Sequence, residues 1–239
     1  MTTGPDSNRV KSESCDQGSA LLAAVRRVLH GLSGLEDMKH RVIFSLALIL
    51  FVMFGHVPLL APHPHVFIYN SIKVVFDEKG LAGFEMKWVF DEMFSNMIIH
   101  DFDKNRNGHL ESSDIKDIKN GAFSNLKKFN YFTHIKINNG VFKVNSVKDF
   151  SAEIKENTLI YRFFVPCHVR AGSSFKEVRI SIYDVSFYCS VFLAKNPVGF
   201  ENTSSYELHH QIGKNKKEAY YYGQVCPDEI IVRFRRKTG

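Results

Sequence analysis

The sequence lacks the short motifs that mark many enzyme active sites. It contains no P-loop, no GxGxxG segment, no nucleophile elbow and no Ser/His/Asp signal at a recognisable spacing. Its 4 cysteines include no CxxC pair, which argues against a thiol-redox role and against a zinc ribbon. These absences predict that the protein is not an enzyme and has no catalytic residues.

Basic residues are in excess, but they are not concentrated. The 31 Lys and Arg residues against 25 Asp and Glu give a net charge of +6. The tight basic runs are confined to residues 214–217 and 233–237. No aromatic stacking platform accompanies these runs, so the sequence does not predict nucleic-acid binding.

Long apolar runs are also absent. The run from Val42 to Phe54 is shorter than the roughly 20 residues that a helix needs to span a membrane. A basic stretch precedes it and Ala61 follows it, which is the order of a secretory signal peptide. We therefore expect residues 38–61 to be a signal peptide or an N-terminal membrane anchor. Residues 1–37 are expected to be a poorly ordered extension, for which a mis-assigned start is one explanation.

The chain from about residue 62 onward is expected to be exported, to the periplasm or a comparable compartment. If the signal is not cleaved, residues 42–61 would tether the protein to the inner membrane, and no other membrane contact is predicted. Three cysteines fall in the exported part, at Cys167, Cys189 and Cys226. An odd number allows at most one intramolecular disulfide and leaves one thiol over.

Residues 62–239 are predicted to form a single β-rich domain. Apolar and polar residues alternate over residues 84–90 and in several later segments, the pattern of a strand with one buried face. Asn139-Gly140 predicts a hairpin turn that pairs Ile137 with Phe142.

A second turn, at Glu156-Asn157, pairs Ile154 with Leu159 and Phe150 with Phe163. With eight or nine short strands expected, the predicted class is α+β. The predicted architecture is an antiparallel, Ig-like β-sandwich with a helical insert at about residues 91–130.

The most specific motif lies inside this insert. Residues 103–114 match the spacing of an EF-hand calcium loop, with Gly108 at the sixth position and Asp114 in place of the usual final Glu. A hard cation binds six to eight oxygens, and the loop offers them from side chains and from the His109 carbonyl. The predicted Ca²⁺ ligands are Asp103, Asn105, Asn107, His109, Glu111 and Asp114.

The segments that flank the loop are predicted to be helices. Asp91 is a plausible N-cap for the first, and an apolar stripe from Ile115 to Phe129 predicts a second, continuous helix. The alternative is an Asn-rich helix–turn–helix that binds no ion. No second loop of this kind occurs, and Asp114 is shorter than Glu, so we expect a weak structural site rather than a calcium sensor.

A second metal motif stands near the expected start of the exported chain. His63 and His65 flank Pro64, which favours an extended backbone, so both imidazoles can lie on one face. Imidazole suits Ni²⁺, Co²⁺, Zn²⁺ and Cu²⁺, so the pair is a candidate transition-metal site. Two ligands are few, and a polar pair at the start of a strand is the structural alternative.

Several segments together resemble a bacterial family catalogued as a domain of unknown function, number 1007. The resemblance covers roughly residues 62–195 and is carried by residues 63–68, 88–94, 101–114, 131–135, 150–152 and 183–184. Members of that family are described as periplasmic components of an uncharacterised ABC-type transport system, often encoded near nickel/cobalt transporters. The resemblance implies an exported protein that handles metal beside an inner-membrane transporter.

The sequence thus predicts an exported, metal-binding accessory protein of a transport system, with a Ca²⁺ loop and a site for a divalent transition metal such as nickel or cobalt. The alternative is a structural or interaction module: a β-sandwich whose ion-locked helical insert binds a membrane partner and which has no transition-metal site.

Overall fold

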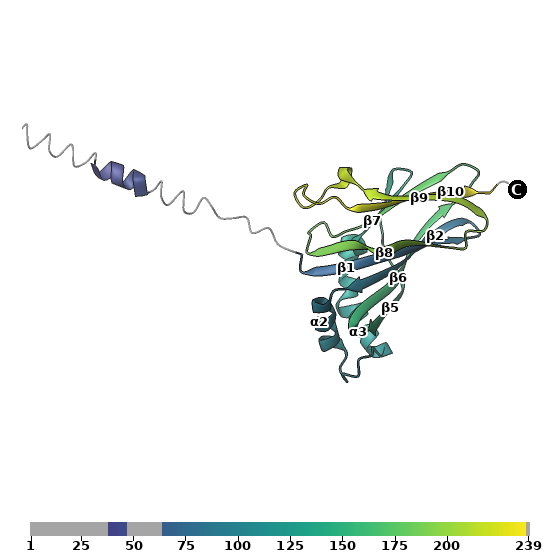
Figure 1. The fold of residues 1–239 in the computed structure, drawn as a ribbon, viewed down its shortest axis with the longest axis horizontal. Helices are drawn as coiled ribbons and strands as arrows, with labels where there is room; N and C mark the ends of the chain where they lie inside the picture. The colour runs from purple at the N-terminus through teal and green to yellow at the C-terminus, as the bar shows by residue number, and fades with distance from the viewer. Residues whose placement is uncertain (1–37, 47–63, 238–239) are drawn as a thin grey trace, which may run out of the picture. The chain divides into compact units, whose positions relative to one another are not determined.

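The computed structural model describes residues 38–46 and 64–237 (Figure 1). The chain divides into two compact units, Met1–Ala61 and Pro62–Gly239. In the first unit, residues 38–46 form a helix. Within the described ranges, no helix is long and apolar enough to cross a membrane. The predicted N-terminal extension, most of the apolar run and His63 lie outside the described residues.

The second unit contains two five-stranded sheets. The first sheet has the strand order β5-β6-β2-β1-β8, with β1 at Val66–Asp77, β2 at Gly80–Phe90, β5 at Lys148–Lys155, β6 at Thr158–Arg170 and β8 at Cys189–Glu201. The second has the order β4-β3-β7-β10-β9, with β3 at Thr133–Ile137, β4 at Gly140–Phe142, β7 at Lys176–Ile182, β9 at Tyr206–Lys214 and β10 at Asp228–Arg236.

Antiparallel pairing dominates both sheets. Of the neighbouring strands, only β1 and β8 among the described residues run parallel, and the other pairs are antiparallel. Two helices and a 3-10 segment lie between β2 and β3 in the sequence: α2 at Glu92–Phe102, α3 at Ser112–Gly121 and η1 at Phe123–Phe132. The predicted α+β class is therefore confirmed, with ten strands where eight or nine were expected.

The β1–β2 hairpin forms as the alternation predicts. In β1, buried residues alternate with more exposed ones along its whole length. The carboxylate of Asp77 accepts hydrogen bonds from the N–H groups of Lys79 and Gly80, which closes the turn. A Cβ on Gly80 would lie 2.2 Å from the Val169 carbonyl oxygen, and its φ is +150°, so the close approach of β6 requires glycine here.

The register predicted for the β3–β4 hairpin is wrong by two residues. Ile135 pairs with Phe142 and Ile137 with Gly140. The turn is therefore Asn138-Asn139, and both residues have positive φ, at 48° and 71°. Asn tolerates this left-handed conformation better than most residues, so two adjacent Asn residues form the two-residue turn without glycine.

In the β5–β6 hairpin, Ile154 pairs with Leu159 as predicted. The predicted pairing of Phe150 with Phe163 is wrong, because a register shift between Lys148 and Ser151 interrupts the ladder there. Asp149 has a φ of 52° at this irregularity. Phe150 stacks instead on Phe123 of η1, with 4.1 Å between ring centroids.

The helical segment also differs from the prediction at one point. Asp91 caps α2 as expected, since its Oδ1 accepts from the Phe94 N–H at 2.9 Å. The second helix is not continuous: α3 ends at Gly121, and η1 follows with positive φ at Asn130 and Tyr131. The apolar stripe is thus divided between an α-helix and a 3-10 segment.

The core has two parts along the first sheet. At one end, Phe76 of β1 packs against Phe234 of β10 at 5.1 Å between ring centroids. At the other end, the rings of Trp88 and of Phe123 in η1 both pack against Phe163, with 4.9 Å and 5.0 Å between ring centroids. Figure 1 shows α2 and α3 gathered beside β5 and β6, so the helices cover this second end of the sheet.

Candidate functional site

The predicted cation loop connects α2 to α3. Asp103 is the C-terminal cap of α2, and Glu111 is the N-cap of α3. Leu110 packs against the hydrophobic core, as expected for the apolar eighth position. The end of α2 and the start of α3 therefore fix the positions of Asp103 and Glu111. The polar side chains between these two residues lie in a short connecting loop.

The carboxylate of Asp103 organises the first half of the loop. It is 3% exposed. Its Oδ1 accepts from the Asn107 N–H at 3.2 Å and its Oδ2 from the Gly108 N–H at 2.8 Å. Gly108 has a φ of +79°, which places its N–H toward Asp103 at the sharp turn. The local backbone thus folds around the first of the predicted ligands.

Three of the predicted ligands meet at one point. Asn105 Nδ2 and Asn107 Nδ2 both donate to Glu111 Oε1, at 3.0 Å and 2.8 Å. The oxygens of both amides accept from backbone N–H groups of the loop: Asn105 Oδ1 from Asn107 at 3.0 Å and Asn107 Oδ1 from His109 at 2.8 Å. Glu111 therefore supplies the oxygen at the meeting point, and an amide that turns its oxygen toward a cation loses one of these backbone hydrogen bonds.

Glu111 and Asp114 interact directly. Hydrogen bonding with Asp114, and then with Asn105 and Asn107, lowers the pKa of Glu111 to about 2. The same contact with Glu111 raises the pKa of Asp114. Asp114 Oδ2 also accepts from the Glu111 N–H at 3.0 Å, and Asp114 is 4% exposed. Two carboxyl groups in contact favour either a shared proton or a bound cation.

In the part of the chain that the structure describes, His, Cys, Asp and Glu side chains do not by themselves form a metal site. Within residues 38–46 and 64–237, no three His, Cys, Asp or Glu side chains gather in a group that could hold a metal ion. In the loop, two of the predicted side-chain ligands are Asn amides, and His109 was expected to contribute its carbonyl oxygen rather than its exposed ring.

The second predicted motif is only partly described, because His63 lies outside the described residues. His65 is exposed, and its ring lies 5.0 Å from that of Tyr188. Its N–H donates to the Tyr188 carbonyl at 2.8 Å, just before β1. The backbone of His65 is thus fixed at the edge of the sheet, while its ring is accessible.

The three described cysteines are free thiols. Cys167 and Cys189 are buried, whereas Cys226 is partly exposed. Burial raises the pKa of Cys167 and of Cys189 to about 12, so neither thiol ionises readily near neutral pH. The disulfide that the cysteine count allowed does not form among these three.

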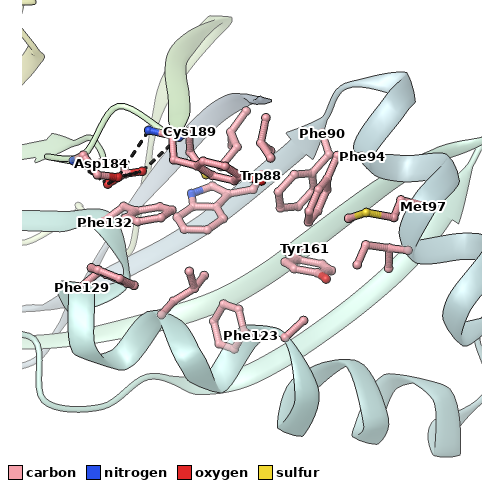
Figure 2. A pocket seen from close by; sticks show the side chains of 17 residues that line it. Trp88, Phe90, Phe94, Met97, Phe123, Phe129, Phe132, Tyr161, Asp184 and Cys189 are labelled. Atoms are coloured by element: carbon pink, nitrogen blue, oxygen red, sulfur yellow. Dashed lines mark hydrogen bonds between the residues drawn. The ribbon is translucent and has the colours of Figure 1, made fainter. Parts of the chain in front are cut away.

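Sequence reasoning missed a large apolar cavity between the first sheet and the helical segment (Figure 2). Its volume is about 530 Å³. The sheet contributes Trp88 and Tyr161, α2 contributes Phe94 and Met97, and η1 contributes Phe129 with other apolar residues. Met97 and Phe129 are 50% and 48% exposed, so the cavity opens to the surface between α2 and η1.

A loop after β7 forms the polar edge of the cavity. Asp184 is 4% exposed. Its Oδ2 accepts from the Cys189 N–H at 3.0 Å, and its Oδ1 accepts from the N–H and the hydroxyl of Ser186, at 2.9 Å and 2.7 Å. Figure 2 shows these hydrogen bonds as dashed lines beside Trp88. The carboxylate is therefore held by its own loop.

Comparison with known proteins places the chain in a family. A family model described as "Protein of unknown function (DUF1007)" matches residues 47–222. An uncharacterized 15.5 kDa protein from the trpE 3′ region of Spirochaeta aurantia is 30% identical over 136 residues, which are 56% of this chain and 96% of that protein. An uncharacterized protein of Haemophilus influenzae is 26% identical over 164 residues, 67% of this chain and 76% of that protein. Because the model matches well over half of its length, the chain belongs to the DUF1007 family.

Proposed function

We propose that this protein is an exported, Ca²⁺-binding accessory protein of a transport system and not an enzyme. The observation that carries the proposal is the convergence of Asn105, Asn107 and Glu111 at one point of a loop whose first half is folded around Asp103. With the His109 carbonyl and Asp114, these residues give the oxygen-rich ligand set that Ca²⁺ prefers.

The fold that we propose for this function is an Ig-like β-sandwich with an EF-hand-like insert. The packing of Phe76 against Phe234 and against Tyr206, at 5.1 Å and 4.9 Å between ring centroids, supports a face-to-face arrangement of the two sheets. The position of residues 103–114 between the C-cap of α2 and the N-cap of α3 supports the EF-hand-like description.

The loop is proposed to be a structural clamp rather than a sensor. It carries three carboxylates, and Asp114 has a shorter reach than the Glu that usually binds through both oxygens. Both features favour a weak site, with a Kd of about 10⁻⁴–10⁻³ M, which suits an exported compartment. A cation there would hold α2 and α3 together and relieve the contact between the carboxyl groups of Glu111 and Asp114.

The link to transport rests on the family resemblance and on the two N-terminal histidines. We propose that His63 and His65 bind a divalent transition metal, with Ni²⁺ or Co²⁺ preferred over Zn²⁺ and Cu²⁺ as the physiological ion. The exposed ring of His65 supports this assignment, because an inner-membrane metal transporter can reach it. The protein is then periplasmic, either released by cleavage or tethered through residues 42–61.

One observation favours the second candidate, an interaction module without a transition-metal site. On the helical insert, Met93, Met97 and Phe129 are 63%, 50% and 48% exposed. Flexible, polarizable Met side chains on an exposed surface are common where a protein binds a partner. In this alternative the ion-locked insert presents these residues to a membrane protein.

The proposal is tested by calorimetric titration of the full-length protein with Ca²⁺. We expect binding with a Kd of about 10⁻⁴–10⁻³ M in the wild type, and none in Asp103→Ala. The matched control is Asp101→Ala, which removes the same charge two positions earlier, where the Asp101 carboxylate interacts with the exposed ring of His100. Absence of Ca²⁺ binding in the wild type, or unchanged binding in Asp103→Ala with a native circular-dichroism spectrum, would refute the proposal.

A further inference from the structure

The stretch from Ile118 to Lys148 contains basic residues and no Asp or Glu. Its lysines stand at positions 119, 127, 128, 136, 143 and 148. The stretch runs from the end of α3 through η1 and the β3–β4 hairpin to the first residue of β5. Its positive charge is therefore not balanced by any carboxylate of the same segment.

Three of these lysines line one surface pocket. Lys127 and Lys128 belong to η1, Lys143 directly follows β4, and the pocket between them has a volume of about 440 Å³. All three side chains are exposed. Among the described residues, no acidic side chain lines this pocket. The remaining lining residues are Ser124, Asn125, Val144 and Asn145.

The three pocket lysines have no ion-pair partner among the described residues. By contrast, Lys136 of the same stretch pairs with Glu218. Of the acidic residues at the two ends of the stretch, Asp117 pairs with Lys104 at 2.8 Å, and Asp149 lies outside the pocket lining. Like charges held close together destabilise a fold. An unbalanced group of lysines in one concave site therefore indicates an anionic ligand.

The two walls of the pocket are fixed by the fold. On the η1 side, Ser124 Oγ and Asn125 Nδ2 donate to carbonyl groups of α3, at 2.7 Å and 2.8 Å. On the other side, Val144 is 2% exposed and belongs to the hydrophobic core, which holds the backbone of Lys143 in place. The ammonium groups are therefore carried by fixed backbone on both sides of the pocket.

The chemistry of the lining suits phosphate. A Lys ammonium is a compact charge with three N–H donors, so it can bind the oxygens of a phosphate group in many orientations. The amides of Asn145 and Asn125 add uncharged donors. The volume falls within the range of about 300–1,000 Å³ that is typical of small-molecule sites. It exceeds that of a single phosphate ion, so a ligand with two phosphates or a phosphate ester fits.

We propose that this pocket binds a phosphate-bearing anion with at least two negative charges. Lys127, Lys128 and Lys143 donate to its phosphate oxygens. Such a ligand can be a soluble diphosphate or the head group of a lipid, and both present the same chemistry to the lysines. The pocket shares no lining residue with the loop at residues 103–114, so the proposal does not depend on Ca²⁺ binding or on the transport role.

The first test is calorimetric titration of the full-length protein with pyrophosphate and, separately, with citrate, without added Ca²⁺. We expect pyrophosphate to bind saturably with a Kd of about 10⁻³ M or tighter. Citrate should bind about fivefold more weakly or less, because its negative charge is spread over three separate carboxylates.

A second arm distinguishes the two sources of phosphate. The full-length protein is sedimented with vesicles of phosphatidylcholine, with and without cardiolipin, whose head group carries two phosphates. Vesicles without cardiolipin account for binding through the apolar run at residues 42–54. Additional binding to cardiolipin that pyrophosphate displaces identifies a lipid head group, whereas binding of pyrophosphate without such an increase identifies a soluble ligand. Either result supports the phosphate site.

Charge-neutralising variants locate the binding. Lys127→Gln and Lys143→Gln should each weaken pyrophosphate binding about fivefold to tenfold, because each removes one charge-assisted hydrogen bond. The matched control is Lys195→Gln, which removes the same charge at an exposed position of β8 outside the pocket and should leave the affinity unchanged. Circular dichroism checks that each variant is folded.

Three results would overturn the proposal. If neither pyrophosphate nor cardiolipin binds saturably, the pocket is not a phosphate site. If citrate binds as tightly as pyrophosphate, the lysines respond to negative charge in general and the assignment of phosphate is wrong. If Lys195→Gln weakens binding as much as Lys127→Gln and Lys143→Gln do, the net charge of the protein rather than this pocket is responsible.

Discussion

Replacing Asn70 by Leu should make the protein more stable. Asn70 is 0% exposed, and both atoms of its amide lack a hydrogen-bond partner among the described residues. An unsatisfied buried donor or acceptor costs about 1–3 kcal/mol. Leu has a similar branched shape and no polar atom, so Asn70→Leu should raise the free energy of unfolding by about 1–3 kcal/mol. For a domain of this size, the melting temperature should rise by about 2–4 °C for each kcal/mol.

The assay is thermal and urea unfolding of the wild type and the variant, without added ligand. The matched control is Asn215→Leu, because Asn215 Nδ2 donates to Glu229 Oε1 at 2.7 Å and Asn215 Oδ1 accepts from the Lys217 N–H at 3.0 Å. Removing these bonds should lower stability by about 1 kcal/mol. A lower melting temperature in Asn70→Leu would show that its amide is hydrogen-bonded in solution, and the inference that a buried, unpartnered amide destabilises the fold would fail.

Three further predictions concern the other titratable and metal-binding groups. Ni²⁺, Co²⁺, Zn²⁺ or Cu²⁺ should bind the wild type with a Kd of about 10⁻⁶ M or tighter and should bind His65→Ala clearly more weakly; calorimetry that finds no such difference removes the transition-metal site. Alkylation followed by peptide mass spectrometry should modify Cys226 before the two buried thiols, whose pKa values burial raises to about 12; modification in the opposite order would contradict the burial. Since contact with Asp114 lowers the pKa of Glu111 from 4.5 to about 2, its carboxylate stabilises the fold above pH 4.5, and this contribution disappears as the pH falls toward 2. The pKa of Asp114 moves the opposite way, so its contribution is present at low pH and is lost as the pH rises. Urea unfolding across this pH range should therefore show a shallower acid-side loss of stability in Glu111→Gln, and equal slopes would contradict the assignment.

Local patterns were sufficient to predict much of the fold. The alternation of apolar and polar residues over residues 84–90 corresponds to β2, and Asp91 caps α2, because both features depend on neighbours in the sequence. The loop at residues 103–114 was likewise identified from spacing alone. In the structure, the hydrogen bonds that the predicted side-chain ligands make with one another and with the loop backbone span at most six residues.

Register was harder to predict than strand identity. In the β3–β4 hairpin, a shift of two residues moves the partner of Phe142 from Ile137 to Ile135, and apolar residues still face apolar residues. The hydrophobic pattern therefore does not distinguish the two registers, since only odd shifts exchange the faces of a strand. The choice depends on which pair of residues takes positive φ, and Asn138-Asn139 does so here.

The cavity could not be predicted from the sequence, because it depends on a space between elements that are distant in the chain. Trp88 and Phe123 carry the pattern of core residues, and their types give no sign that the packing between sheet and helices is incomplete. One local signal exists: Asn70 occupies a position of β1 where the alternation calls for an apolar residue, between Ile68 and Ile72. A polar residue on the buried face of a strand costs stability unless it has a partner, and natural proteins accept such a cost chiefly where function requires it. The strand register places Asn70 beside Trp88 and Tyr161, which line the cavity, although Asn70 itself does not line it.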